Sequence, residues 1–300
     1  MMKRLGKFGL VCILAIATVL TMSFYADARK KKKNIKLNKI ERVFKKASRI
    51  LEETGYNNQN SDFKNTTSVS SNLTQVRINS RVSNVTKQYT AMTVNFNTAY
   101  RVPNCVSYVL TSEMVDITNG PNAQNRRNYK FYRDPSVSGC PEWYEYRGSG
   151  YDRGHMAPAN DMRWSTQSMS DCFLMTNICP QDHDLNGGSW NKLELKIHDW
   201  AKRYSKIIVA TGPIFNGNNQ RIGQNNDIVV PAGFFKVVLD PSRNRAIGFV
   251  YENHEGGGGV KRHACSVDNV ERITGHDFFS ALPDNIENAI ESTFSFDQWN

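Results

Sequence analysis

The sequence predicts an α+β protein with a central, mainly antiparallel sheet flanked by helices. The clearest observation is a hairpin signal, in which apolar residues 233–239 and 246–251 flank the turn-forming stretch Asp-Pro-Ser-Arg-Asn-Arg. Further apolar strands are predicted at 106–110 and 207–210, and strands outnumber helices. Helical periodicity is clearest at 189–204. Strands joined mainly by short turns, with few helices, are typical of this class.

The predicted helix at 189–204 contains an acidic residue on its apolar side. Ser189 can cap its first turn. Glu194 falls within the arc of the apolar face, so its carboxylate needs a nearby cation, because an unpaired buried charge is very costly. Two more helical segments are predicted at 267–273 and near 284–292.

Composition divides the chain into four parts. Residues 1–28 have bases before an apolar run and small residues at its end, which predicts a secretory signal peptide. An uncleaved membrane anchor is the alternative. Residues 29–54 form a basic amphipathic segment, 55–94 a polar linker, and 95–300 the globular domain. We therefore expect a secreted or periplasmic protein, or a membrane-anchored one if cleavage does not occur.

The formal net charge of +10 comes from the N-terminal part of the chain. Residues 29–50 contain eleven Lys or Arg and one Glu, whereas residues 51–300 carry 24 basic and 26 acidic side chains. A nucleic-acid function must therefore rest on a local site and not on the overall charge. The basic segment is interpreted either as a solvated export remnant or as a tether to polyanions or to an anionic membrane surface.

Five cysteines lie beyond Cys12. In an exported protein they favour disulfides over a metal site, and none has CxxC spacing. An odd number leaves one thiol free or pairs it between chains, which would give a homodimer. The pairing is not fixed by the sequence. These cysteines are Cys105, Cys140, Cys172, Cys179 and Cys265.

Side chains that can take part in catalysis are concentrated at residues 151–161. His155 is the side chain best suited to accept a proton from water near neutral pH, and a neighbouring carboxylate can fix its tautomer. A surface loop with one satisfied histidine is the alternative interpretation. A second polar cluster at 177–194 supplies the amides and the carboxylate that a lone base lacks.

Three sequence blocks, in this order, carry a family resemblance: Asp152-Arg153-Gly154-His155-Met156-Ala157-Pro158, Asn177-Ile178-Cys179-Pro180-Gln181, and Leu185-Asn186-Gly187-Gly188-Ser189-Trp190-Asn191-Lys192-Leu193-Glu194. Together they resemble the DNA/RNA non-specific endonuclease family, a ββα-metal group that includes secreted bacterial nucleases and endonuclease G. The resemblance covers roughly residues 95–295. It implies a metal-dependent endonuclease that cuts DNA and RNA and leaves 5′-phosphate ends.

The resemblance also implies roles for five residues. His155 would be the general base and Asn186 the direct ligand of Mg²⁺, with Mn²⁺ as a substitute metal. Glu194 would hold metal-bound waters, while Asn177 and Gln181 would position His155 and the substrate. An amide oxygen suits this chemistry, because hard cations prefer oxygen ligands and keep several waters when few protein groups bind them.

Four arginines are candidates for phosphate contacts. The family carries an arginine that neutralises the transition state, and either Arg126 or Arg127 matches it. Arg153 and Arg163 are expected to contact phosphate or to brace the site.

Two other functions are compatible with the same residues. A zinc-dependent hydrolase would use His155 and His183, although the chain has no matching second pair of ligands. A catalytically dead nucleic-acid-binding or uptake protein would keep the fold and the basic segment without cutting.

Overall fold

The computed structural model describes residues 73–217, 220–254 and 258–300, which belong to a single compact unit. The predicted signal peptide (1–28) and basic segment (29–54) lie outside these residues. The predicted linker (55–94) lies only partly outside them, because it contains β1 (Val85–Gln88) and the start of β2 (Thr93–Asn97). Within the described residues, no helix has the length and apolar character needed to cross a bilayer.

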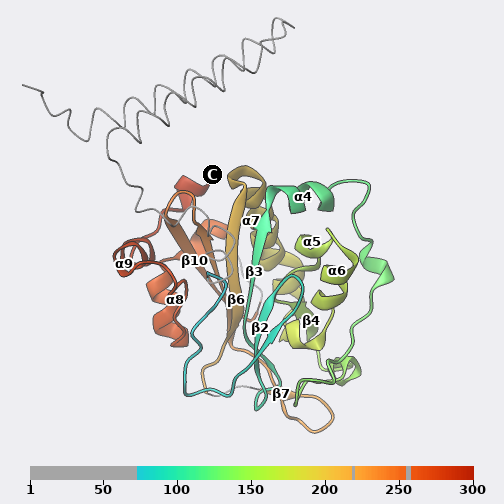
Figure 1. Cartoon of the computed structure of the whole chain (residues 1–300). Helices are drawn as coiled ribbons and strands as arrows, with labels where there is room; N and C mark the ends of the chain where they lie inside the picture. The colour runs from blue at the N-terminus through green and yellow to red at the C-terminus, as the bar shows by residue number, and fades with distance from the viewer. Residues whose placement is uncertain (1–72, 218–219, 255–257) are drawn as a thin grey trace, which may run out of the picture. The chain divides into compact units, whose positions relative to one another are not determined.

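A seven-stranded sheet forms the centre of this unit (Figure 1). Besides β1 and β2 its strands are β3 (Val102–Thr111), β6 (Lys206–Ile214), β9 (Gly233–Asp240), β10 (Arg245–Glu252) and β11 (Ala264–Cys265). The order is β1-β2-β3-β6-β9-β10-β11, and all neighbouring pairs are antiparallel. The predicted fold class is confirmed, and β9 and β10 form the predicted hairpin.

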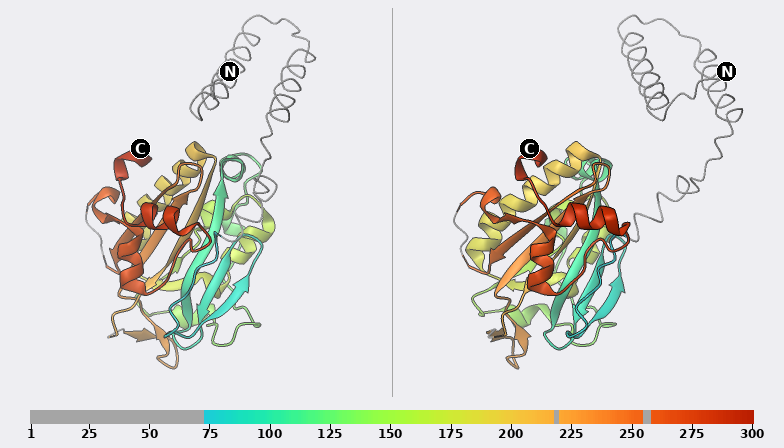
Figure 2. Two further views of the ribbon diagram at one scale, coloured as in Figure 1. Left: turned by 60° about the vertical axis from the view of Figure 1, so that its left-hand side comes forward. Right: turned by 90° about the vertical axis from the view of Figure 1, so that its left-hand side faces the viewer.

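Helices cover both faces of the sheet. The helices are α4 (Ser112–Thr118), α5 (Ala159–Met162), α6 (Thr166–Cys172), α7 (Asn191–Tyr204), α8 (Val267–Thr274) and α9 (Asp284–Glu291). Helices α8 and α9 lie on one face and the others on the opposite face (Figures 1 and 2). Short 3-10 turns occur at Arg126–Asn128, Trp143–Tyr146, Met175–Asn177, Val260–His263 and Phe296–Trp299.

The two faces have separate cores because side chains alternate along each strand. On β6, Ile207 and Val209 join the core under α7, whereas Ile208 and Ala210 join the core under α8 and α9. Strands buried on both faces read as continuous apolar runs, which is why β6 and β9 were recognisable in the sequence.

The candidate site is built on a smaller unit beside the main sheet. Strand β4 (Asp152–His155) pairs with β5 (Ile178–Gln181), and the chain continues into α7, which gives a ββα arrangement. A third two-stranded sheet joins β7 (Arg221–Ile222) to β8 (Ile228–Val229). The ββα unit brings all three polar sequence blocks together.

The predicted N-cap at Ser189 is wrong. Leu185–Trp190 forms a π-helical turn that leads directly into α7, with a kink at Gly188, where φ is −104° and ψ is −106°. A cap needs a non-helical residue at the start of the helix, and here the chain is already wound before α7 begins. The Ser189 hydroxyl is buried and has no hydrogen-bond partner among the described residues.

The expected disulfides within the chain are also wrong for the five cysteines that the structure describes. All five are free thiols, four of them buried and Cys265 partly buried. They act as small apolar groups in the two cores. Burial raises the pKa of the Cys140 thiol to about 12, so this group stays protonated and unreactive at neutral pH.

Candidate active site

His155 lies at the end of β4, where its imidazole is packed between two phenylalanines. The ring centroids of Phe131 and Phe173 are 5.2 and 5.0 Å from that of His155. The residue is only 8% exposed, and its Nε2 atom is shielded and has no hydrogen-bond partner among the described residues. A buried ring nitrogen without a partner is costly, so this atom is available to a water or substrate group in the site.

Asn177 holds the chain that follows His155 in place. Its Oδ1 accepts a hydrogen bond from the Ala157 amide at 2.9 Å, and its Nδ2 donates to the carbonyls of Ala157 and Cys172 at 3.0 and 2.9 Å. The Asn177 carbonyl also accepts from the Met156 amide. The side chain is thus fully occupied by backbone groups around His155, and it is completely buried.

Gly154 on β4 packs directly against the Gln181 side chain on β5. A Cβ atom on Gly154 would lie 2.2 Å from Gln181 Oε1 and 2.6 Å from Gln181 Cβ, so only glycine fits beside this side chain. Both polar atoms of the Gln181 carboxamide are shielded and without partners among the described residues. They are a second unsatisfied polar group in the same ββα unit.

Two guanidinium groups surround the imidazole. Arg126 lies 5.8 Å from the Phe173 ring centroid and Arg153 lies 4.8 Å from that of Phe131. Burial, and then the positive charges of Arg126 and Arg153, lower the pKa of His155 to about 3. The imidazole is therefore neutral at pH 7 and has a free lone pair, and an anionic phosphate that offsets the two positive charges would raise its basicity.

The other two arginines have different positions. Arg127 is exposed, and the contact that the structure gives it is a backbone hydrogen bond to the Asn125 side chain. Arg163 donates from Nε to the Gln124 carbonyl at 2.9 Å, which braces the loop that leads to Arg126. Of the two adjacent arginines, Arg126 is therefore the one beside the aromatic rings around His155.

Asn186 is tied to the first residue of β4. Its Nδ2 donates to Asp152 Oδ2 at 2.8 Å, and the Nδ1 atom of His183 is 3.0 Å from the same oxygen. Asp152 therefore orients the amide, whose Oδ1 has no recorded hydrogen bond within the described residues. Asp182 starts this turn by accepting from the amides of Asp184 and Leu185. A neutral amide oxygen of this kind fits a hard divalent cation that keeps most of its waters.

Glu194 is only partly buried, and it has the nearby cation that its place on the apolar side of α7 requires. Its Oε1 atom lies 3.7 Å from Nζ of Lys236, a residue of β9 that is 1% exposed. Lys236 also donates to the Met156 carbonyl at 3.4 Å, which connects α7 to the residue after His155. Burial raises the pKa of Glu194 and lowers that of Lys236, as expected for charges removed from water.

A zinc site at His155 and His183 is not supported. Within residues 73–217, 220–254 and 258–300, the cluster of three or more His, Cys, Asp or Glu with metal-binding spacing contains neither histidine. The His183 side chain is largely exposed and pairs with Asp152, which raises its pKa.

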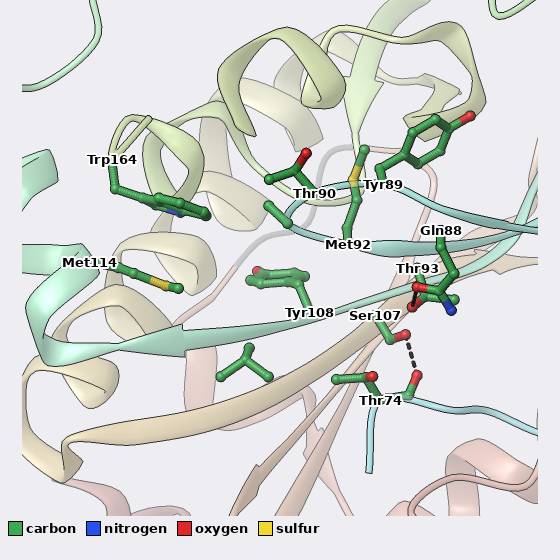
Figure 3. A pocket seen from close by; sticks show the side chains of 12 residues that line it. Thr74, Gln88, Tyr89, Thr90, Met92, Thr93, Ser107, Tyr108, Met114 and Trp164 are labelled. Atoms are coloured by element: carbon green, nitrogen blue, oxygen red, sulfur yellow. Dashed lines mark hydrogen bonds between the residues drawn. The ribbon is translucent and has the colours of Figure 1, made fainter. Parts of the chain in front are cut away.

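A separate cavity of about 210 Å³ lies between β2, β3 and Trp164 (Figure 3). Its described lining includes Tyr108, Met114 and Trp164, together with Ser107, which donates a hydrogen bond to the Thr74 carbonyl. None of the lining residues carries a charge. The cavity therefore lacks the cations that phosphate binding requires, and it is not the candidate active site.

The sheet, its helices and the ββα unit together define the ββα-metal nuclease fold. The family model described as DNA/RNA non-specific endonuclease matches residues 69–285, and the chain belongs to this family.

Individual relatives agree with this assignment. The chain is 34% identical to "Nuclease EXOG, mitochondrial" of Danio rerio, in a match covering 65% of this chain and 60% of the relative. It is 36% identical to "Endonuclease G, mitochondrial" of Bos taurus over 38% of this chain and 42% of the relative. A chain in the crystal structure of the EndoG/EndoGI complex matches with a TM-score of 0.61 and 27% identity, over 66% of this chain and 86% of that chain.

The chain spans between 56% and 60% of the length of the four EXOG relatives that it matches. The relatives in zebrafish, cow and fission yeast are named as mitochondrial nucleases. This finding overturns the expectation of a secreted or periplasmic protein. The apolar segment on which that expectation depended lies outside the described residues.

Proposed function

We propose that the chain is a metal-dependent endonuclease that hydrolyses phosphodiester bonds of both DNA and RNA, with His155 as its general base. The observation that carries the proposal is the neutral imidazole, whose Nε2 atom is shielded, unpartnered and flanked by Arg126 and Arg153. Family membership supports the substrate class. The imidazole accepts a proton from the attacking water, which then forms the new bond to phosphorus.

The two arginines beside the imidazole neutralise charge on the phosphoryl oxygens. As negative charge grows on these oxygens, Arg126 and Arg153 stabilise the transition state more than the ground state. Bond cleavage on the 3′ side leaves a 5′-phosphate, the polarity that the family resemblance implies. Arg163 acts indirectly by holding the loop that carries Arg126.

Asn186 is the residue proposed to hold Mg²⁺, or Mn²⁺ in its place, through Oδ1. When bound, the cation offsets phosphoryl charge and supplies an acidic water for the leaving oxygen. The Asp152 carboxylate accepts a hydrogen bond from Asn186 Nδ2, so Asn186 Oδ1 points away from Asp152. Glu194, held by Lys236, accepts hydrogen bonds from waters in the site.

Asn177 and Gln181 are proposed to act as positioning residues. Asn177 fixes the backbone that directly follows His155, which limits the movement of the imidazole at the end of β4. Gln181 offers its unpartnered carboxamide to a water or to the substrate. Trp143 lies between two arginines: the guanidinium carbons of Arg153 and Arg147 are 5.9 and 4.3 Å from its ring centroid. We propose that these three side chains contact the bases and phosphates of a bound strand.

Cleavage of plasmid DNA and of RNA, each with Mg²⁺ and with EDTA, tests the proposal. Both substrates should be cut with Mg²⁺ and neither with EDTA. His155→Ala should lower the rate by a factor on the order of 10²–10⁴, the range for a positioned general base, while circular dichroism shows an unchanged fold. Substantial residual cleavage by this variant would remove His155 as the base. Binding without cutting by the unaltered protein would instead support the catalytically dead alternative.

Two expected partners concern other surfaces. Contacts of the basic segment with polyanions or an anionic membrane surface involve residues 29–54, which lie outside the described residues. A homodimer also remains a prediction from the sequence.

A further inference from the structure

Three carboxylates from two helices converge on the side of the sheet opposite the candidate active site. Asp268 and Glu271 are three residues apart on α8 and therefore share one face of that helix. Glu291 is the last residue of α9, which lies beside α8 (Figure 2). One carboxylate oxygen from each residue lies within 4.8 Å of the other two.

Glu291 is buried in this cluster without a partner. The residue is 4% exposed, and its Oε1 atom is shielded and has no hydrogen-bond partner among the described residues. Its neighbour Ile290 packs in the core under α8 and α9, which fixes the end of α9. A buried carboxylate oxygen without a donor is a costly arrangement, so it indicates a ligand or a proton at this place.

No ion pair among the described residues offsets the charge of the cluster. In the part of the chain that the structure describes, no Lys, Arg or His forms an ion pair with Asp268, Glu271 or Glu291. The amide of Phe278 donates to one Glu271 oxygen at 2.8 Å, which leaves the other oxygen available. A cluster of three carboxylates without a paired cation needs a positive charge from a bound ligand.

We propose that Asp268, Glu271 and Glu291 bind a divalent cation of the size of Ca²⁺, which ties the end of α9 to α8. Carboxylate oxygens are the ligands that this ion prefers, at about 2.3–2.6 Å, so oxygens on opposite sides of it are about 4.8 Å apart. The mutual distances of the three oxygens fall within this limit. Mg²⁺ demands shorter bonds and near-ideal octahedral geometry, which fits three ligands of unequal burial less well.

Calorimetric titration of the full-length Asn186→Ala protein with CaCl₂ tests the proposal, because this substitution removes the ligand proposed for the catalytic metal. We expect about one Ca²⁺ per chain, and a Tm that rises with Ca²⁺ concentration, since an ion that binds only the folded state stabilises it. Glu291→Gln and Glu271→Gln keep the shape of the side chain but remove its charge. Each should weaken Ca²⁺ binding by about tenfold or more.

Glu287→Gln is the matched control, since Glu287 lies one turn earlier on α9 and is not part of the cluster. It should bind Ca²⁺ as the parent does. The proposal is overturned if the Asn186→Ala protein shows no saturable binding, or if Glu287→Gln weakens binding as much as Glu291→Gln. It is also overturned if Tm responds to pH and to Glu291→Gln but not to Ca²⁺, because a shared proton then explains the cluster. None of these results depends on nuclease activity.

Discussion

At the scale of single residues, two adjacent arginines that the sequence could not distinguish occupy different environments. Both are exposed, but Arg126 lies over the Phe173 ring and its charge acts on His155, whereas the contact that the structure gives Arg127 is with the Asn125 side chain. Arg126→Gln should therefore lower kcat/KM on the order of 10²-fold, the usual cost of removing a group that stabilises transition-state charge. Arg127→Gln is the matched control and should change it only a few-fold. Steady-state cleavage of a short duplex measures both, and equal losses would contradict the assignment.

Lys236 is the site residue that sequence reasoning missed. It lies within the apolar run Gly-Phe-Phe-Lys-Val-Val-Leu-Asp of β9, where every residue is buried. A lysine in a central strand is rare unless it is paired. A lysine in this buried strand therefore indicates a paired charge. Helical periodicity alone predicts that Glu194 needs a nearby cation. What the sequence could not provide was the connection, because α7 and β9 meet only in the folded chain.

At the scale of elements, the β4–β5 pair depends on the absence of a side chain at Gly154. Gly154→Ala would place a Cβ 2.6 Å from Gln181 Cβ, which is attached to the backbone and cannot rotate away. We expect a loss of unfolding free energy of about 1–3 kcal/mol, the usual cost of overpacking, together with lower activity as His155 shifts. Gly187→Ala is the control for stability, since a Cβ there meets nothing within 4 Å. Chemical denaturation of both variants measures the difference.

The elements that sequence predicted well are those with a strong local pattern. Strands β6, β9 and β10 were visible as apolar runs, and α7 as a helical stripe. Strand β1 was assigned to a linker because its residues are mostly exposed and polar, so its pairing with β2 leaves no apolar signal. The π-helical turn before α7 was missed for a related reason, since its Asn-Gly-Gly sequence favours a turn without specifying how it is wound.

At the scale of the whole molecule, the two cores each hold a histidine that burial keeps neutral. Burial lowers the pKa of His155 to about 3 and that of His276 to about 4, against an ordinary value of about 6.5. Between these folded values and 6.5 the unfolded chain binds more protons, so the unfolding free energy must decrease as pH falls through this window. Each histidine should contribute about 1.4 kcal/mol per pH unit.

Urea denaturation at intervals from pH 6.5 to 4.5 measures this slope for the protein, for His155→Gln and for His276→Gln. Each substitution should reduce the loss of unfolding free energy at low pH by the contribution of the histidine that it removes. The carboxylates contribute equally to both curves, so the difference between the curves isolates that histidine. Since His276 contacts Phe235 in the core under α8 and α9, and His155 lies in the other core, their effects should add in the double variant. Curves parallel to that of the unaltered protein would mean that the imidazole titrates alike in both states. For His155 such a result would remove the neutral, sheltered base on which the proposed hydrolysis depends.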